Sequence, residues 1–437
     1  MPSTDPRLSL SGTIGVGLVL AGSLAMTPWL RPASMATTTA IAWLVMSLGW
    51  ALLAVALVGR TVPLSTSSRR IVITVALVCI GVLTPIHDVL SDDVYRYIWD
   101  GWITTHGVNP YAYAPVDDGI QWLRAQGTAG WYPDIVTFEK LKTIYPPGAQ
   151  AWFALSSWIG GLDDVLWKIP TIVCVLLLWA VADRWAKNRG ARRDMALLIL
   201  LSPVVLLHGV VDAHVDIVMT TVMIAAMMLM ERRRMVLGAV VLGLAASIKL
   251  LPLVAIPMLW RKTPWPRALA FTAIVMITLG LTYVPFLGVD LFGSLGLFAK
   301  AWSANSLVHT IASAVTGPVV ARRICLVLFA MLASAVWWYH RREPVTMIAM
   351  ILVALMITTP VLHPWYVIPL IALLPFATLR SSIVLCTTIS MSGLIIRHYI
   401  ERGVWLEHPA WLVIEFVPVF VALWIDVRRG QIPTVTA

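Results

Sequence analysis

Charged side chains are scarce in this sequence. Of its 437 residues only 12% are Asp, Glu, Lys or Arg, whereas 59% are hydrophobic. A soluble domain carries about 25% charged residues, so the scarcity excludes an ordinary soluble protein. Apolar runs near the ~20 residues needed to cross a bilayer recur along the chain, separated by short charged loops. We therefore expect an all-α integral membrane protein with many transmembrane helices.

Cysteine is also scarce. The four cysteines stand singly within apolar runs, at Cys79, Cys174, Cys325 and Cys386. This spacing indicates neither a metal site nor a disulfide framework. No small-residue cleavage site ends the apolar stretch at residues 10–28, which favours a retained first helix over a cleaved signal. No internal repeat supports a transporter built from two related halves.

The net charge of +10 is carried by loops between the apolar runs. This pattern is typical of membrane topology and not of a phosphate-binding stripe, so no nucleic acid partner is expected. We expect about twelve spans in a single polytopic domain, 1–437. They lie at about residues 10–28, 39–59, 71–87, 165–184, 194–208, 214–230, 267–285, 320–339, 344–362, 365–379, 381–396 and 409–426.

The distribution of Lys and Arg predicts the orientation. With both termini cytoplasmic, Arg7 and the loops on that side hold 20 of the 32 Lys and Arg residues. The opposite face has two long loops, 88–147, with eight acids against four bases, and 285–319. The positive-inside rule therefore places these loops outside the plasma membrane. Two long loops on one side favour an enzyme with one active face over a channel or carrier.

Two further apolar segments are too short or too broken to span. The stretch between residues 234 and 261 is interrupted near Lys249, and 147–160 is bounded by prolines and glycines. We expect both to be re-entrant short helices. Broken helices at membrane depth are tolerated only where protein or a water-filled cavity covers the freed backbone, so the two breaks predict a cavity.

Asp92 and Asp93 follow the third predicted span, at the start of the first long loop. Adjacent carboxylates repel, so one of them is expected to have a raised pKa suited to a general base. Helical spacing places Asp93, Tyr97 and Asp100 along one face, with Arg96 beside Asp92 or Asp93. The alternative is a solvated acidic helix start, since Asp is a good N-cap.

Other polar and aromatic residues gather at the predicted outer helix ends. A phosphate group would explain cations there, because Lys, Arg and His donate charge-assisted hydrogen bonds to its oxygens. The candidates for holding a phosphate are Lys249, Arg322, Arg323 and His363. Snorkelling to lipid headgroups is the alternative for the two arginines. The candidates for binding a sugar or acceptor are Arg96, Tyr97, Asp100, Asn109, Tyr145, His214, Asp216, Asn305, His309 and Tyr366.

Two alternatives stay open for these groups. Aromatic side chains over a polar cavity can stack on a sugar ring, but they also form the belt at membrane interfaces. A metal is conceivable at the group of acids and histidines between two predicted spans, yet its spacing matches no strong metal motif, and no metal is expected. That group consists of His208, Asp212, His214 and Asp216.

In their order and sidedness these motifs resemble the GT-C superfamily of polytopic glycosyltransferases. The resemblance is greatest to the actinobacterial mannosyltransferases that depend on polyprenyl-phosphomannose. The matching features run from Asp88 to Tyr366. They are Asp93 four residues before Tyr97, Asn109-Pro110-Tyr111, Tyr145-Pro146-Pro147, Ala213-His214-Val215-Asp216, Lys249-Leu250-Leu251-Pro252, Asn305-Ser306-Leu307 and His363-Pro364-Trp365-Tyr366.

The resemblance implies an enzyme that transfers a sugar from a polyprenyl-phosphate donor to an envelope glycolipid or polysaccharide. It assigns the general base to Asp93, with Asp92 as the alternative, and holds the lipid-linked donor between helices with its phosphate on basic residues. The expected sugar is mannose, with arabinofuranose as an alternative, and no cofactor is implied. A polytopic lipid or sugar transporter or flippase is the competing function.

Overall fold

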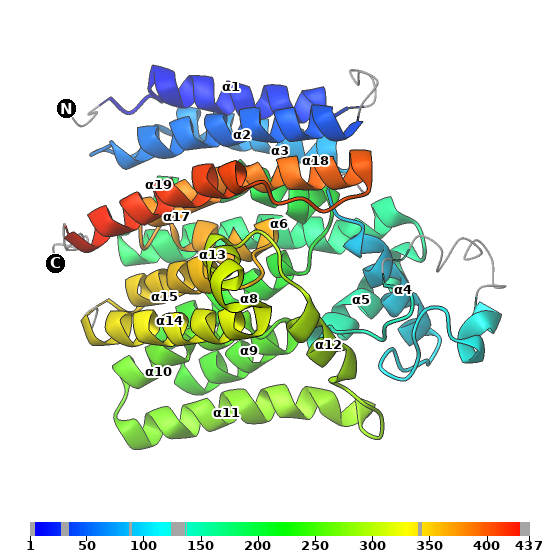
Figure 1. Ribbon diagram of the computed structural model, residues 1–437. Helices are drawn as coiled ribbons and strands as arrows, with labels where there is room; N and C mark the ends of the chain where they lie inside the picture. The colour runs from blue at the N-terminus through cyan, green and yellow to red at the C-terminus, as the bar shows by residue number, and fades with distance from the viewer. Residues whose placement is uncertain are drawn as a thin grey trace. The chain divides into compact units, whose positions relative to one another are not determined.

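The computed structural model describes residues 5–27, 35–86, 90–123, 136, 138–339 and 343–428. Within these residues every regular element is a helix (Figure 1), and the one pairing outside helices is an isolated bridge between Ala304 and Val361. The expected all-α class is therefore confirmed. Asp88, where the predicted acidic loop begins, lies outside the described residues.

The chain divides into two compact units. Unit 1 comprises Met1–Ile86, Val175–His208 and Ser303–Ala437, and unit 2 comprises His87–Cys174 and Gly209–Trp302. The helices of unit 1 are α1 (Leu10–Ala25), α2 (Met35–Val58), α3 (Thr66–Leu83), η4 (Arg193–Ala196), α7 (Leu197–Leu200), α13 (Leu307–Thr316), α14 (Pro318–Tyr339), α15 (Pro344–Thr358), η8 (Pro364–Val367), α16 (Ile368–Leu373), α17 (Arg380–Thr388), η9 (Ile389–Met391), α18 (Ser392–Arg402) and α19 (Pro409–Arg428).

The helices of unit 2 carry most of the residues predicted to do chemistry. They are α4 (Asp93–Thr105), η2 (Asp118–Leu123), α5 (Pro147–Gly160), α8 (Asp216–Glu231), α9 (Met235–Ile248), η6 (Leu251–Ala255), α10 (Ile256–Lys262), α11 (Trp265–Tyr283), η7 (Val284–Phe286) and α12 (Gly293–Ala301). Two helices continue from one unit's residues into the other's, α6 (Asp164–Arg189) and the π-helix η5 (Val205–Val211).

Seven helices among the described residues are long and apolar enough to cross a membrane, or eight if one bent pair is counted as a span. Each of the seven coincides with a predicted span. They are Ala36–Val58, Thr66–Leu83, Asp164–Arg189, Trp265–Phe286, Pro318–Tyr339, Arg380–Arg402 and Pro409–Arg428. The chain is thus a membrane protein by helix length and composition.

The predicted count of twelve full spans is not confirmed. Three of the remaining five segments form helices of only 16, 16 and 15 residues, namely α1, α8 and α15. The segment 194–208 bends by 53° between Leu200 and Val205. Pro203 lies at this bend, and proline cannot donate the backbone hydrogen bond that would continue the helix. The segment 365–379 is divided between η8 and α16.

The helix break predicted at Lys249 is confirmed. Helix α9 ends at Ile248, and Lys249 is extended, with φ −157° and ψ 142°. Pro252 lies in the short η6 helix that follows, and proline favours such a boundary because it lacks an N–H group. The other short element, predicted at 147–160, is α5, which begins with Pro147 at its first position, where proline is well tolerated.

Close helix packing in unit 1 depends on small residues and on buried charge. Gly15 of α1 and Gly49 of α2 face each other so closely that a Cβ on Gly15 would lie 2.5 Å from the Gly49 carbonyl oxygen. Small residues permit such approach between membrane helices. The Asp183 carboxylate in α6 accepts from Arg69 of α3 and from Arg193 of η4, which joins the three helices.

In unit 2, α4 lies directly against α5 (Figure 1). The contact depends on Gly101, because a Cβ there would lie 2.3 Å from the carbonyl oxygen of Phe153. Helix α9 packs on both α5 and α8. This packing positions three chain segments that carry predicted site residues, namely the start of α4, the start of α8 and the end of α9.

Candidate active site

Asp93 is the first residue of α4, and Asp92 occupies the N-cap position. An acid in the first helical turn interacts favourably with the helix dipole. The Asp92 side chain makes no capping hydrogen bond, although its position is that of the predicted N-cap. The Asp93 amide instead donates to the Ser91 hydroxyl, at 3.3 Å. Both acids thus stand at a helix start, but Asp92 is exposed whereas Asp93 is only partly so.

Three side chains surround one oxygen of the Asp93 carboxylate. The hydroxyls of Tyr97 and Tyr145 lie 3.4 and 3.5 Å from Asp93 Oδ2, and His214 Nδ1 lies 3.9 Å from it. The Tyr97 hydroxyl also lies 3.0 Å from His214 Nδ1 and 3.2 Å from the Tyr145 hydroxyl. We call Asp93, Tyr97, Tyr145 and His214 the Asp93 cluster. It brings together four predicted site residues from three separate parts of unit 2.

Aromatic packing fixes the orientation of this cluster. The Tyr97 ring stacks on Phe153 of α5, with centroids 4.6 Å apart and planes at 10°, and meets Tyr145 edge to face at 5.1 Å. The His214 ring lies edge-on to Tyr97. Tyr97 and His214 are fully buried. Offset-stacked and edge-to-face pairs are the favoured aromatic geometries, so the polar ends of these rings are held at Asp93.

The surroundings raise the pKa of Asp93 to about 7. Burial is the largest cause, followed by repulsion from Asp92; Asp212 acts in the same direction, whereas Lys249 and the Tyr97 hydrogen bond lower it. The side chain retains 31% exposure, so the carboxylate is partly desolvated yet reachable. A carboxylate that titrates near neutral pH is suited to accept a proton from a hydroxyl group.

Lys249 is paired with Asp216. Its ammonium nitrogen lies 2.8 and 2.9 Å from the two carboxylate oxygens of Asp216, the first residue of α8. The Asp216 side chain is 1% exposed, and that of Lys249 24%. A buried carboxylate is costly unless it is paired, so Asp216 holds the lysine at the break after α9. Both oxygens of Asp216, a predicted sugar-binding residue, therefore contact an ammonium group.

Arg96 does not pair with Asp92 or Asp93, so that expectation is wrong. Its Nε donates to Asp100 Oδ1 at 2.8 Å, one helical turn further on, and its Nη1 donates to the carbonyl of Leu141 at 2.9 Å. The reason is burial: Asp100 is 1% exposed and needs a partner, whereas Asp92 is exposed to solvent. Arg96 and Asp100 thus join α4 to the loop before α5.

The turn at Asn109 supports the cluster indirectly. The Asn109 side-chain carbonyl accepts from the Tyr111 amide at 2.9 Å, a local bond that shapes the turn. The Tyr111 hydroxyl then donates to the main-chain carbonyl of Tyr145 at 2.7 Å. Asn109, predicted to bind the sugar, therefore has a role in this turn, and Tyr111 positions the Tyr145 backbone.

Two features of unit 2 were not among the predicted site residues. Lys168, fully buried in α6, donates to the carbonyl of Val211 at 3.2 Å. Ala213 has φ +50°, a conformation that non-glycine residues rarely adopt. These residues fix the chain on either side of Asp212. A lysine inside an apolar span is itself a signal of function, and it marks Lys168 in the sequence.

The remaining predicted residues lie in unit 1. Two loops meet there, because the Ala304 amide donates to Pro360 and its carbonyl accepts from Leu362, at 3.1 and 2.9 Å. Asn305 lies in one of these loops, and His309 lies in α13, which follows it. His363 lies in the other loop, and its ring is 5.5 Å from that of Tyr366 in η8. Arg322 and Arg323 follow in α14.

Arg322 affects the protonation of His309. Burial lowers the pKa of His309, and the positive charge of Arg322 lowers it further. Both effects favour the neutral imidazole over its protonated form. The predicted site residues thus form two groups, one in each unit.

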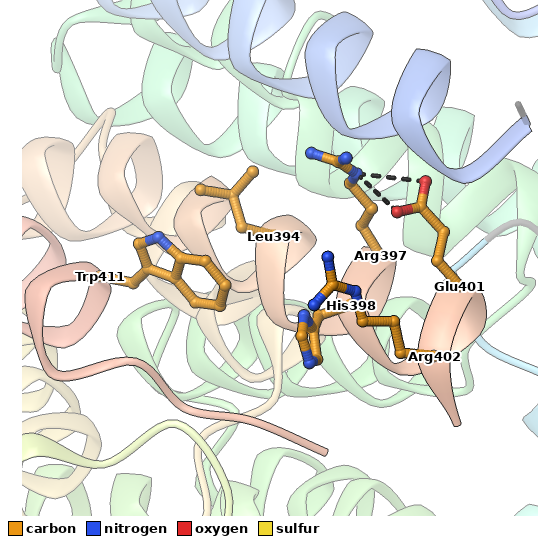
Figure 2. Close-up of a pocket in the computed structure, with 6 residues that line it drawn as sticks. All are labelled: Leu394, Arg397, His398, Glu401, Arg402 and Trp411. Atoms are coloured by element: carbon orange, nitrogen blue, oxygen red, sulfur yellow. Dashed lines mark hydrogen bonds and ion pairs between the residues drawn. The ribbon is translucent and has the colours of Figure 1, made fainter. Parts of the chain in front are cut away.

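A small pocket of about 170 Å³ lies at the end of α18 in unit 1. Figure 2 shows the residues that line it, Leu394, Arg397, His398, Glu401, Arg402 and Trp411. Arg397 Nε lies 3.2 Å from both oxygens of Glu401, one turn along the same helix, and Arg402 lies in the last turn, where a cation complements the helix dipole. None of the predicted site residues lines this pocket.

Comparison with known proteins gives a consistent family. Residues 7–263, more than half of the chain, match the model of the alpha-(1->6)-mannopyranosyltransferase N-terminal domain. The chain is 25% identical over 340 residues to alpha-(1->6)-mannopyranosyltransferase A of Mycobacterium tuberculosis, covering 68% of this chain and 63% of the relative. It is 26% identical over 182 residues to the protein of that name from Corynebacterium glutamicum, and this match covers 38% of this chain and 34% of the relative. The matches span less than two thirds of the length of either relative.

Proposed function

The chain belongs to the family of alpha-(1->6)-mannopyranosyltransferases, as its sequence motifs predict, and on that premise we propose that it is an inverting mannosyltransferase. Its donor would be a polyprenyl-phosphate sugar, its acceptor an envelope glycolipid or polysaccharide. The reaction would take place on the extracytoplasmic side of the plasma membrane. The excess of basic residues in the other predicted loops supports this side for Asp93.

The observation that carries this proposal is the Asp93 cluster. Asp93 is partly exposed, titrates near neutral pH, and is held by Tyr97, Tyr145 and His214. This is the arrangement that a general base needs, with a matched pKa and a fixed orientation. Asp92 is exposed, whereas the Asp93 carboxylate is only partly exposed and is held by these three side chains, which favours Asp93 as the base.

The proposed reaction is a single displacement. Asp93 takes the proton of an acceptor hydroxyl, and the hydroxyl oxygen forms a bond to the anomeric carbon of the donor. The bond from that carbon to the phosphate oxygen breaks, and polyprenyl phosphate leaves with the electron pair. One step of this kind inverts the anomeric configuration. Preorganised cations that offset charge on the leaving phosphate would supply a large part of the rate enhancement.

The candidate phosphate ligands in this proposal are Lys249 in unit 2 and Arg322, Arg323 and His363 in unit 1. Lys249 is supported by its partial exposure and by its effect on the Asp93 charge. Asp216 would act by holding the lysine ammonium in place. Since side chains alone can stabilise a monophosphate leaving group, the mechanism we propose uses no metal.

A matched pair of variants tests the assignment. In membranes supplied with polyprenyl-phosphomannose, the rate of mannose transfer by Asp93→Asn is expected to fall by about 10²- to 10⁴-fold, the usual contribution of a general base. Asp92→Asn is expected to keep its activity at pH 8, and expression of both is checked by immunoblot. A dead Asp92→Asn beside a fully active Asp93→Asn would move the base by one residue. Full activity in both would refute a base at this position.

A further inference from the structure

A buried carboxyl group in unit 1 has no role in the mechanism above. Glu415 lies in α19, a helix long and apolar enough to cross a membrane, and it is 1% exposed. Ionisable residues buried in membrane helices are costly, and they commonly mark sites that bind or move a ligand. Glu415 also lies outside residues 7–263, the part of the chain that matches the family model.

The partner of Glu415 is Asn305, which is held from two directions. The Asn305 side-chain amide donates to Glu415 Oε1 at 2.9 Å, and its backbone amide donates to Glu407 Oε1 at 2.8 Å. The same Glu407 oxygen accepts from the indole nitrogen of Trp405. Asn305 has φ +49°, a conformation that recurs in ligand-binding turns. These two hydrogen bonds hold the Asn305 side chain against α19.

Three polar atoms of this region lack a hydrogen-bond partner among the described residues. They are Asn305 Oδ1, Glu415 Oε2 and His309 Nε2. Their side chains are 2%, 1% and 5% exposed. A buried polar atom without a partner costs about 1–3 kcal/mol, and proteins rarely leave several together. Three such atoms on neighbouring segments therefore indicate a ligand that supplies the missing partners.

We propose that Asn305, Glu415 and His309 form a binding site for the hydroxyl groups of a carbohydrate. The two bare oxygens accept hydrogen bonds, His309 Nε2 donates or accepts according to the imidazole tautomer, and a sugar hydroxyl can do either. The ring of His363 stacks on that of Trp365, with planes at 3°. His363 follows the residues that pair with Ala304, and the stack offers an aromatic face for a sugar ring. The choice of a mannoside as the ligand rests on the proposed function.

A cation fits this site less well. Ca²⁺ takes six to eight oxygen ligands and Mg²⁺ about six, whereas the site offers two bare oxygens and an imidazole nitrogen. Glu407 Oε1 already accepts from two N–H groups. The balance of acceptors therefore favours a neutral ligand with several hydroxyls over a metal ion.

The test is a binding measurement that does not depend on transfer. Octyl α-D-mannopyranoside is titrated, below its critical micelle concentration, into the purified full-length protein in a sugar-free detergent, and tryptophan fluorescence is followed. Glu415→Gln, which keeps the oxygen bound by Asn305 but replaces the bare oxygen with a donor, is expected to weaken binding about tenfold. The matched control is Glu401→Gln in α18, which is expected to bind as the wild type does.

Thermal unfolding separates a ligand site from a structural brace. Glu415→Gln is expected to melt at the wild-type temperature while losing affinity. A fall in melting temperature with unchanged affinity would show a brace and overturn the proposal. So would no binding by the wild type, or binding that disappears when a chelator removes divalent cations.

The same assay is read independently of the base assignment. If Asp93→Asn still transfers mannose, the proposed mechanism fails, but the affinity loss in Glu415→Gln continues to report on this site.

Discussion

The pH dependence of transfer tests the charge balance at Asp93. With a pKa of about 7, the carboxylate is about one-tenth ionised at pH 6 and about nine-tenths ionised at pH 8. If Asp93 is the base, kcat/KM for mannose transfer should be about tenfold lower at pH 6 than at pH 8. An aspartate with its ordinary pKa of about 3.9 would give a flat profile over this range. The measurement is the rate of transfer from polyprenyl-phosphomannose in detergent, in buffers from pH 5 to pH 9.

Two variants should move this acid limb in opposite directions. The charge of Asp92 raises the pKa of Asp93, so Asp92→Asn should shift the limb to lower pH and leave the plateau intact. The charge of Lys249 lowers that pKa, so its removal should shift the limb to higher pH. Because the buried Asp216 would lose the charge of its lysine partner, the second variant is made as Lys249→Met with Asp216→Asn.

A stability measurement provides the control for folding. Folding raises the pKa of Asp93 above its unfolded value, so the folded state binds the proton more tightly. This group therefore reduces stability as pH rises from about 4 to about 7. Asp93→Asn should remove that pH dependence and melt no lower than the wild type at pH 8.

A wild-type transfer rate that is flat from pH 5 to pH 8 would refute the assignment of Asp93 as the base. So would an acid limb that moves to higher pH in Asp92→Asn.

Two further predictions concern the packing that holds the cluster. Gly101→Ala places a Cβ 2.3 Å from the Phe153 carbonyl, so it should separate α4 from α5 and cost about 1–3 kcal/mol in thermal unfolding; a wild-type melting temperature would contradict this close approach. Asp100→Asn leaves Arg96 buried without its charged partner and should cost about 3–5 kcal/mol. The double variant Arg96→Met with Asp100→Leu should recover much of that loss, and a double variant as unstable as the single one would argue against the pair.

The sequence alone determined the fold class and several boundaries. Seven apolar runs were predicted as spans and form helices of sufficient length, because run length is a local property of the chain. The break at Lys249 was likewise predictable, since Pro252 and the basic ends act locally. The family followed from the order of motifs such as the one at His214. The contact between Tyr97 and Asp93 was predictable from helical spacing.

The tertiary structure decided which partners those residues have. Tyr97 meets His214 across 117 residues of sequence, and Lys249 meets Asp216 across 33. Spacing favoured Arg96 beside either Asp92 or Asp93, but burial of Asp100 selected another carboxylate. No pattern in the sequence singles out such choices, because they depend on which carboxylate loses its water when distant helices pack.

The same physical reason explains what sequence reading missed. Glu415 looks like one acid in an apolar helix until the Asn305 amide is found on it and its second oxygen is found without a partner. Composition and periodicity determine that the chain forms helices of membrane length. Desolvation, which only the packed structure specifies, determines which few polar groups on those helices must be satisfied by one another or by a substrate.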